Sequence, residues 1–172
     1  YFTKNSPLSK LENDIQIEGY FTNYRIHTNE VFNKIKAYIK GLKIIKKYRD
    51  MNYIAIHLRE LHGTGKNKIN NLIDNLNIEY YAKCLNKIYQ NSHNNKLMYA
   101  VVFSDTYKDP EKSLLIPRIK DLLKNYGIHY INGDETISSS LDLISIFSYS
   151  KFCIISNSTL SWWGAYLSDG EV

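Results

Sequence analysis

The sequence predicts an α/β protein built on a Rossmann-like parallel sheet with helices on both faces. From residue 53 onward, short apolar runs alternate with segments whose apolar residues recur at helical spacing. Polar side chains follow the carboxyl end of each apolar run, where parallel sheets bind ligands. Short buried strands that alternate with helices argue for βαβ units. We therefore predict a Rossmann-like domain over residues 51–172, preceded by a mostly helical segment over residues 1–50.

The composition is that of an ordinary globular chain. Its 172 residues can sustain one core without disulfides or metal, and 44% are hydrophobic and 23% charged. The longest purely apolar run, residues 97–103, is far shorter than the roughly 20 residues of a membrane helix. Because the chain begins at Tyr1 and stops soon after a Trp pair, we expect a piece of a longer protein. A cytoplasmic or membrane-peripheral location is expected if the source is microbial, with any anchor outside this piece.

The net charge of +5 indicates an anionic partner, which is a nucleic acid, a phosphate or an acidic glycan. Basic residues at helical spacing are typical of the solvated face of an amphipathic helix, which makes a nucleic-acid partner the less favoured alternative. Much of the excess charge lies at Lys34, Lys36, Lys40, Lys43, Lys46, Lys47 and Arg49. The two cysteines, Cys84 and Cys153, lack metal-ligand spacing and are expected to be buried free thiols.

The first segment is predicted to be mostly helical. Ser6-Pro7 can cap a short helix, and an extended piece over residues 15–20 follows, ended by Gly19. Thr28 then precedes a helix of several turns that reaches residue 45. Its apolar face carries Val31, Phe32, Ile35, Tyr38, Ile39, Leu42 and Ile45.

Residues 53–58 form a nearly continuous apolar run, as expected of a central strand buried on both faces. The run ends in His57 and Arg59, which places polar groups at its carboxyl end. Residues 61–77 are rich in Asn and Gly and are predicted to form a long loop, which in a compact domain is usually functional or mobile.

The remaining elements continue the alternation. Helices are expected over residues 78–89, over 111–126 with a possible interruption at Pro117, and after a cap at 138–140. Gly127 is expected to end the second of these helices. Strands are expected over residues 97–103, 128–131 and 152–155. The last strand leads into a turn and a helix start within residues 156–165.

Four strand ends converge at one edge of the predicted sheet. They carry His57 and Arg59, Ser104 and Asp105, Gly133 and Asp134, and residues 157–161. An arginine that faces a helix N-terminus can clamp a phosphate, because its planar fork and the free helix N–H groups both bind anions. A diphosphate site is therefore predicted.

Known phosphate motifs are absent from the sequence. It lacks both G-x-G-x-x-G and G-x-x-x-x-G-K-[ST], and no Asp-x-Asp pair is present to hold a divalent metal. Residues 156–165 taken alone indicate a helix cap, with Trp162 and Trp163 packed rather than stacked on a sugar.

Several motifs together carry a family resemblance. They are His57-Leu58-Arg59, Phe103-Ser104-Asp105, the acid Asp142, and Cys153-Ile154-Ile155-Ser156-Asn157-Ser158-Thr159-Leu160-Ser161-Trp162-Trp163-Gly164-Ala165-Tyr166-Leu167, with Gly19-Tyr20-Phe21 upstream. In order and spacing they resemble the α-1,2-fucosyltransferases of glycosyltransferase family 11. The resemblance covers nearly the whole chain. It implies the C-terminal, donor-binding half of a GT-B enzyme, truncated at its C-terminus, with residues 1–50 ending the acceptor-side half.

The resemblance also implies roles for individual residues. Arg59 would bind the β-phosphate of GDP-fucose and stabilise the departing diphosphate, with His57 beside the guanosine. Asp142 would accept from guanine N–H groups. The implied nucleotide-binding set is His57, Arg59, Asp105, Asp142, Ser158, Thr159, Leu160 and Ser161. The implied reaction is an inverting transfer of L-fucose from the donor GDP-fucose to a galactoside 2-hydroxyl on a glycan, with no metal cofactor and no nucleic-acid partner.

One departure from the family pattern leaves alternatives open. After His-x-Arg the family usually continues Arg-Gly-Asp, whereas this chain has Glu60-Leu61-His62-Gly63. Glu60 and His62 are candidates for the group that removes the acceptor proton. The alternative functions are transfer from another nucleotide sugar, non-catalytic nucleotide or glycan binding, and nucleic-acid binding.

Overall fold

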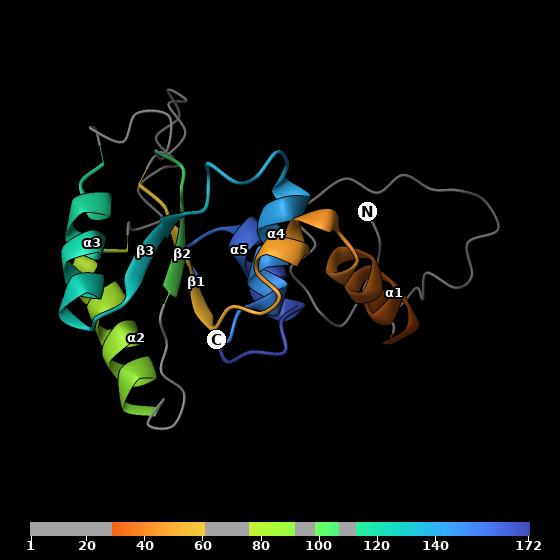
Figure 1. Cartoon of the computed structure of the whole chain (residues 1–172), viewed down its shortest axis with the longest axis horizontal. Helices are drawn as coiled ribbons and strands as arrows, with labels where there is room; N and C mark the ends of the chain where they lie inside the picture. Colours follow the sequence, from red (N-terminus) through yellow and green to blue (C-terminus); the bar gives the residue numbers. More distant parts are fainter. Residues whose placement is uncertain (1–28, 61–75, 92–98, 107–112) are drawn as a thin grey trace, which may run out of the picture.

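A computed structural model of the chain describes residues 29–60, 76–91, 99–106 and 113–172 (Figure 1). In these ranges a small parallel sheet lies between two layers of helices. The helices are α1 (Asn29–Lys40), the 3-10 helix η3 (Lys43–Lys47), α2 (Ile78–Asn91), α3 (Leu115–Asn125), α4 (Ser140–Tyr149) and α5 (Thr159–Tyr166). The strands are β1 (Tyr53–Leu58), β2 (Tyr99–Ser104), β3 (His129–Asn132) and β4 (Phe152–Ile154).

The strands are parallel in the order β3-β2-β1-β4. Tyr53 of β1 is in register with Tyr99 of β2, and Ile54 with Phe152 of β4. The chain moves outward from β1 to β3 on one side and then returns to place β4 on the other side. The order therefore reverses between β1 and β4, and such a switch point is where open α/β sheets bind ligands. The predicted Rossmann-like α/β fold is confirmed.

Both faces of the sheet are covered, which explains why β1 is apolar without alternation. Ile54, Ile56 and Leu58 pack in a core with α2 and α3. Tyr53 and Ala55 point the other way, into a core with α4 and α5. Figure 1 shows α2 and α3 on one side of the sheet and α1, α4 and α5 on the other. Every residue of β1 is buried, as predicted for a central strand.

The helix predicted after Thr28 and up to residue 45 is interrupted, and this part of the prediction is wrong. α1 ends at Lys40, where Gly41 N–H bonds the carbonyls of Ala37 and Tyr38, and the 3-10 helix η3 follows. Glycine is a poor helix former, so the chain can turn here at little cost. The turn brings Tyr48 fully into the core, where its hydroxyl bonds the Thr136 hydroxyl at 2.7 Å.

α3 runs without interruption through Pro117, so the interruption that the sequence allows there does not occur. Pro117 is the third residue of the helix, within the first turn, where its missing N–H has no intrahelical acceptor to lose. Gly127 ends the helix with φ 67°, a left-handed conformation that glycine adopts without strain. The predicted terminator is therefore confirmed.

The described part of the first segment packs on the Rossmann-like part. Ser145 of α4 donates to the carbonyl of Ile39 at 2.7 Å, and the Tyr149 hydroxyl donates to that of Lys40 at 3.0 Å. The division into residues 1–50 and 51–172 stays a prediction. The elements expected at Ser6-Pro7, at residues 15–20 and over most of the 61–77 loop lie outside the described residues, as does His62.

Candidate functional site

A hydrogen bond joins the ends of β1 and β4 across the switch point. Nδ1 of His57, near the end of β1, lies 2.8 Å from the hydroxyl oxygen of Ser156, which follows β4. Two adjacent tyrosines of α2, the helix on the face of the sheet shared with α3, hold the same two strand ends. Tyr80 donates to the carbonyl of Ile155 at 2.8 Å, and Tyr81 donates to that of His57 at 3.2 Å. The distance between the two strand ends is therefore set from both sides.

His57 is only 5% exposed. Burial, assisted by the positive charge of Arg59, lowers the pKa of His57 to about 4. The imidazole is therefore neutral at physiological pH, with one ring nitrogen as donor and the other as acceptor.

Arg59 follows β1 directly and is half-buried. None of the ion pairs formed within the described ranges includes its guanidinium. An arginine at the carboxyl edge of a parallel sheet, beside the switch point, is placed to meet an anionic ligand.

Glu60 is committed to a structural contact. Its Oε1 accepts the backbone N–H groups of Leu114 at 2.7 Å and Leu115 at 2.9 Å, at the start of α3. Its Oε2 accepts the hydroxyls of Thr106, at 3.1 Å, and Ser113. The carboxylate therefore caps α3 from a distant part of the chain. It is held by four donors, which argues against its predicted candidacy as the group that removes the acceptor proton.

The ends of β2 and β3 add two carboxylates to this edge, as the convergence of strand ends predicts. Asp105 accepts the backbone N–H of Glu60 at 2.9 Å, and Asp134 accepts that of Ser104 at 2.8 Å. Burial raises the pKa of Asp134 to about 6 despite the Ser104 N–H, with a smaller contribution from the charge of Asp105. Asp105 thus orients the chain just after Arg59. A contact between Asp105 and a nucleotide stays a prediction.

Asp142 caps α4. It forms a capping box with Ser139, and its Oδ2 accepts from Ser138 N–H, Ser138 Oγ and Ser139 N–H at 2.9 to 3.0 Å. Burial raises the pKa of Asp142, but the hydrogen bonds outweigh it and leave the pKa below its ordinary value. The predicted cap at residues 138–140 is confirmed. Asp142 also borders an open cavity of about 640 Å³ beside Ser138 and the segment from Gly41 to Ile44.

The start of α5 differs from the other helix starts that follow a strand in the described ranges. Asn77 caps α2, Glu60 caps α3, and Ser139 with Asp142 caps α4. The N-cap of α5, Ser158, is extended and its side chain makes no capping hydrogen bond. Because the first N–H groups of a helix have no intrahelical acceptor, this start can accept an anion.

The remaining predicted residues of α5 divide into two groups. Thr159 and Leu160 lie in its first turn and are half-buried. Ser161 is fully buried and donates to the carbonyls of Ser158 at 3.1 Å and Ser156 at 3.5 Å. Ser161 therefore holds the turn together from beneath, while Ser158, Thr159 and Leu160 before it are half-buried.

The sequence profile of glycosyl transferase family 11 matches residues 15–172. The chain belongs to glycosyl transferase family 11. Comparison with curated proteins gave no match, nor did comparison with solved structures. Family membership makes this a glycosyltransferase chain, whose partners are a nucleotide-sugar donor and an acceptor glycan. Within the described ranges, no helix has the length and apolarity to cross a membrane.

In this family 11 chain the Trp pair is part of the packing. The ring of Trp162 stacks on Tyr166 with 4.9 Å between centroids and meets Trp163 edge-on at 5.2 Å. The ring of Tyr166 in turn meets that of Phe32 of α1 edge-on, with 5.0 Å between their centroids. These contacts agree with the predicted packing role and tie α5 to α1.

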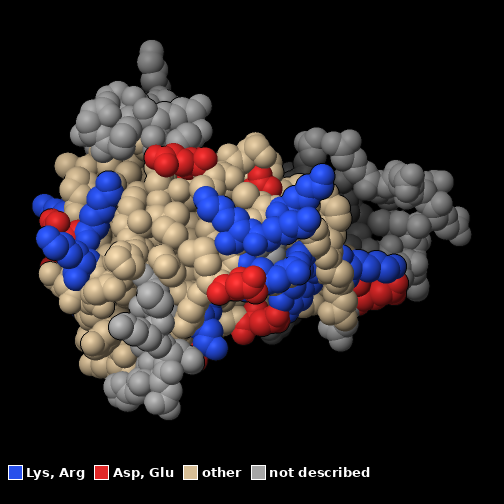
Figure 2. Space-filling view, viewed as in Figure 1, with Lys and Arg blue, Asp and Glu red and all other residues tan. Residues whose placement is uncertain are grey.

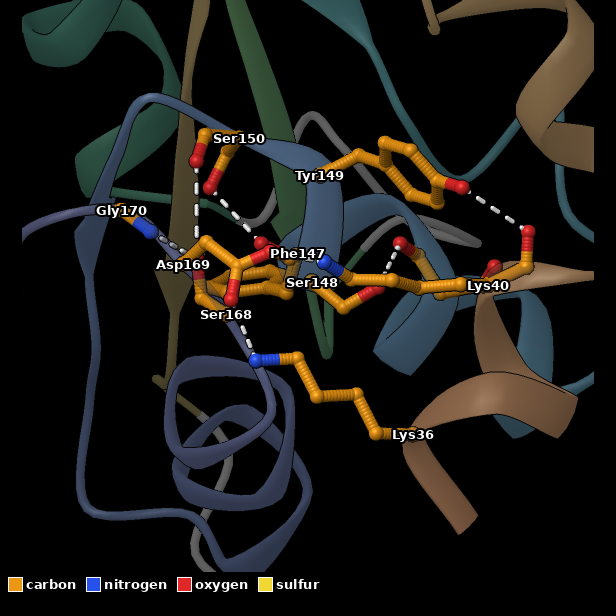
Figure 3. Close-up of polar contacts among 10 residues, drawn as sticks. Lys36, Lys40, Phe147, Ser148, Tyr149, Ser150, Ser168, Asp169 and Gly170 are labelled. Atoms are coloured by element: carbon orange, nitrogen blue, oxygen red, sulfur yellow. Dashed lines mark hydrogen bonds and ion pairs between the residues drawn. The ribbon is translucent and has the colours of Figure 1, made fainter. Parts of the chain in front are cut away.

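A second cavity, of about 520 Å³, lies at the opposite, amino edge of the sheet. Its charged lining is balanced, with three basic and three acidic side chains (Lys40, Arg49, Lys151, Asp50, Asp169 and Glu171). Figure 3 shows Asp169 beside Lys36 and Lys40, with which it forms ion pairs. Figure 2 shows basic and acidic side chains interspersed over this part of the surface. The balance of charge gives this edge no preference for the anionic donor of a family 11 enzyme.

Four residues of the carboxyl edge were not predicted individually as part of the site's framework: Ser156, Tyr80, Tyr81 and Glu60 in its capping role. Ser156 lies inside the strongest family motif, which is the signal that could have selected it. Tyr80 and Glu60 carry no local signal, because their partners are distant in the sequence.

Proposed function

We propose that this protein is an inverting fucosyltransferase that moves L-fucose from GDP-fucose to the 2-hydroxyl of a galactoside on a glycan. The observation that carries the proposal is the position of Arg59 at the end of β1, across the switch point from α5, whose N-cap residue Ser158 makes no capping hydrogen bond through its side chain. Family membership supports glycosyl transfer. The resemblance to α-1,2-fucosyltransferases supports this donor and acceptor.

The chemistry assigned to the site is electrostatic. The acceptor oxygen attacks the anomeric carbon of fucose from the face opposite the diphosphate, the bond to GDP breaks, and the acceptor proton passes to a general base, for which His62 stays the candidate. Negative charge grows on the β-phosphate as that bond breaks. Arg59 and the N–H groups in the first turn of α5 stabilise this charge, because both are fixed before the reaction begins. In this proposal no metal cofactor is required.

We assign the guanosine to the open cavity that Asp142 lines at the start of α4. Asp142 is held ionised by its three donors and borders an open cavity, so it can accept the N–H groups of guanine. The walls contributed by Leu42 and Ile44 suit a flat base. UDP lacks the guanine N–H groups, and this contact therefore favours GDP.

Two alternatives share the same edge of the sheet. A transferase that uses another nucleotide sugar would keep Arg59 and α5 and differ at the base. A non-catalytic relative that binds nucleotide or glycan is favoured by the engagement of Glu60 as the cap of α3, since the position after Arg59 then supplies no free group for chemistry.

The first test is a titration of the full chain with GDP, UDP, GDP-fucose and an oligonucleotide at several salt concentrations. GDP binding that survives moderate salt is expected. Stronger binding of UDP would favour another nucleotide sugar, and oligonucleotide binding that collapses with salt would favour a nucleic-acid partner.

The second test is turnover of GDP-fucose with galactosides by the full-length parent and its variants. Arg59→Ala is expected to lower kcat by about 100-fold or more, the usual effect of removing one group that stabilises the transition state. Arg49→Ala, at the amino edge of the sheet, is the matched control and should retain activity. Wild-type activity in Arg59→Ala would refute the phosphate assignment. Fucose release without transfer would locate a defect on the acceptor side.

A further inference from the structure

Either Ser156 or His57 can be the donor in the hydrogen bond between them, and the burial of both side chains determines which arrangement is favoured. Both side chains are nearly inaccessible, with His57 5% and Ser156 6% exposed. Their mutual contact of 2.8 Å is the one hydrogen bond that either side chain makes within the described ranges. A buried polar hydrogen or lone pair without a partner is costly, so the two possible directions can be compared by what each leaves unsatisfied.

In the first direction the Ser156 hydroxyl donates to Nδ1 of His57. The hydroxyl proton is then satisfied, and the neutral ring carries its own proton on Nε2, which is the one group left without a partner in the described surroundings. In the second direction Nδ1–H donates to Ser156. The hydroxyl proton then has no acceptor and Nε2 has no donor, and two groups are left unsatisfied in the described surroundings. The first direction therefore costs less.

We propose that Ser156 is a positioning residue: its hydroxyl donates to Nδ1 of His57 and holds the ring as the tautomer with its proton on Nε2, a hydrogen-bond donor for the bound nucleotide. Ser156 is suited to this because its own carbonyl accepts from Ser158 N–H at 2.7 Å and from Ser161 Oγ. One residue thus links the end of β1 to the turn that begins α5.

The choice of nucleotide as the ligand rests on the proposed function. The chemistry is more general, because an Nε2–H donor selects an acceptor atom, such as a ribose hydroxyl, a base carbonyl or a phosphate oxygen. It disfavours a donor group at that point. The tautomer of His57 can be observed without any ligand, so it can be tested separately from the identity of the ligand.

The decisive measurement is a nitrogen NMR spectrum of the full chain with ¹⁵N-labelled histidine at neutral pH, with His57 assigned by its absence in His57→Gln. The expected spectrum shows a protonated Nε2 and an unprotonated Nδ1 for His57. A protonated Nδ1 would overturn the proposal. If the expected tautomer is present and the chain binds no GDP, the proposed function fails and the positioning of His57 by Ser156 stands.

Variants extend the test to binding. Ser156→Ala should weaken GDP binding about tenfold, the effect of disordering one hydrogen bond to the ligand. Ser156→Thr keeps the hydroxyl and should restore both the tautomer and the affinity. Ser148→Ala removes another buried serine hydroxyl, which donates to the carbonyl of Ser145, and serves as the control for general destabilisation. Equal GDP affinity in Ser156→Ala and wild type would overturn the proposal.

Substitution of the ring discriminates between its two nitrogens. The amide nitrogen of His57→Gln lies near the position of Nε2 and can donate there, whereas that of His57→Asn lies near Nδ1. His57→Gln should therefore retain more GDP affinity than His57→Asn. The reverse order would contradict the assigned tautomer.

Discussion

The carboxylate of Glu60 accepts the backbone N–H of Leu115 at 2.9 Å, so the residue that follows Arg59 caps the helix that follows β2. The same carboxylate also accepts from Leu114 N–H, Thr106 and Ser113. A cap supplied by a different strand end ties the loop after β1 to the start of α3. The direction in which the chain leaves Arg59 is thereby restricted.

Glu60→Ala should lower the free energy of unfolding by about 1 to 2 kcal/mol, since it removes a charged cap from a helix start. Glu60→Gln should lose less, because its amide oxygen can still accept. Denaturant unfolding of both variants measures this, and Glu79→Ala, an exposed acid in the first turn of α2, is the control. A Glu60→Gln variant with wild-type stability and no transferase activity would show that Glu60 acts in catalysis instead.

Stability should fall as the pH is lowered from 6.5 towards 4, because of His57. Its pKa is lowered to about 4 in the folded protein by burial and by Arg59, from an ordinary value of 6.5. Between these values the unfolded chain binds the proton and the folded chain does not, so acid favours unfolding. The full loss in the free energy of unfolding is about 3 kcal/mol, which follows from the difference between the two pKa values of His57. His57→Gln should flatten this part of a stability profile measured by denaturant unfolding.

Asp134 should have the opposite pH dependence. Burial raises the pKa of Asp134 from 3.8 to about 6, so between these values the folded chain holds a proton that the unfolded chain has lost. The stabilisation from this group is present below pH 3.8 and is lost as the pH rises through 6. Asp134→Asn keeps an oxygen to accept the Ser104 N–H and should therefore be at least as stable as wild type at pH 7. The free energy of unfolding of Asp134→Asn minus that of wild type should rise between pH 4 and pH 7. A fall in this difference would contradict the raised pKa of Asp134.

Gly164→Ala should destabilise the contact between α4 and α5. An added Cβ at Gly164 would lie 2.5 Å from Cβ of Phe147, closer than two carbons can approach. Overpacking of this kind costs about 1 to 3 kcal/mol. Gly41→Ala is the matched control, because its added Cβ meets its nearest atoms at an ordinary 3.4 Å. Thermal unfolding of the two variants should separate them clearly.

Transferase activity should be unchanged by removal of divalent metal with a chelator. In the proposed mechanism Arg59 and the start of α5 carry the charge that develops on the diphosphate. Activity of the full-length parent after extensive dialysis against EDTA, compared with the same sample resupplied with Mg²⁺ or Mn²⁺, measures this. Loss of activity that either metal restores would contradict the metal-free mechanism.

The alternation of elements could be predicted from the sequence because it rests on local periodicity. The buried run of β1, the capped start of α4 and the glycine that ends α3 all lie where their residue types indicate. The helix expected after Thr28 and up to residue 45 was wrong beyond Lys40, because the chain turns at Gly41 and places Tyr48 in the core. That gain in burial involves partners far away in the sequence.

The sequence by itself determined the Rossmann-like fold, the family and the edge of the sheet at which the candidate site lies, since strand ends of a parallel sheet must share one edge. Only the tertiary structure decided what each polar group does there. Ser156 and His57 are 99 residues apart, and Glu60 and Leu115 are 55 apart. Local patterns cannot assign such pairs, because whether a carboxylate caps a helix or meets a ligand depends on which donor the fold brings within hydrogen-bonding distance.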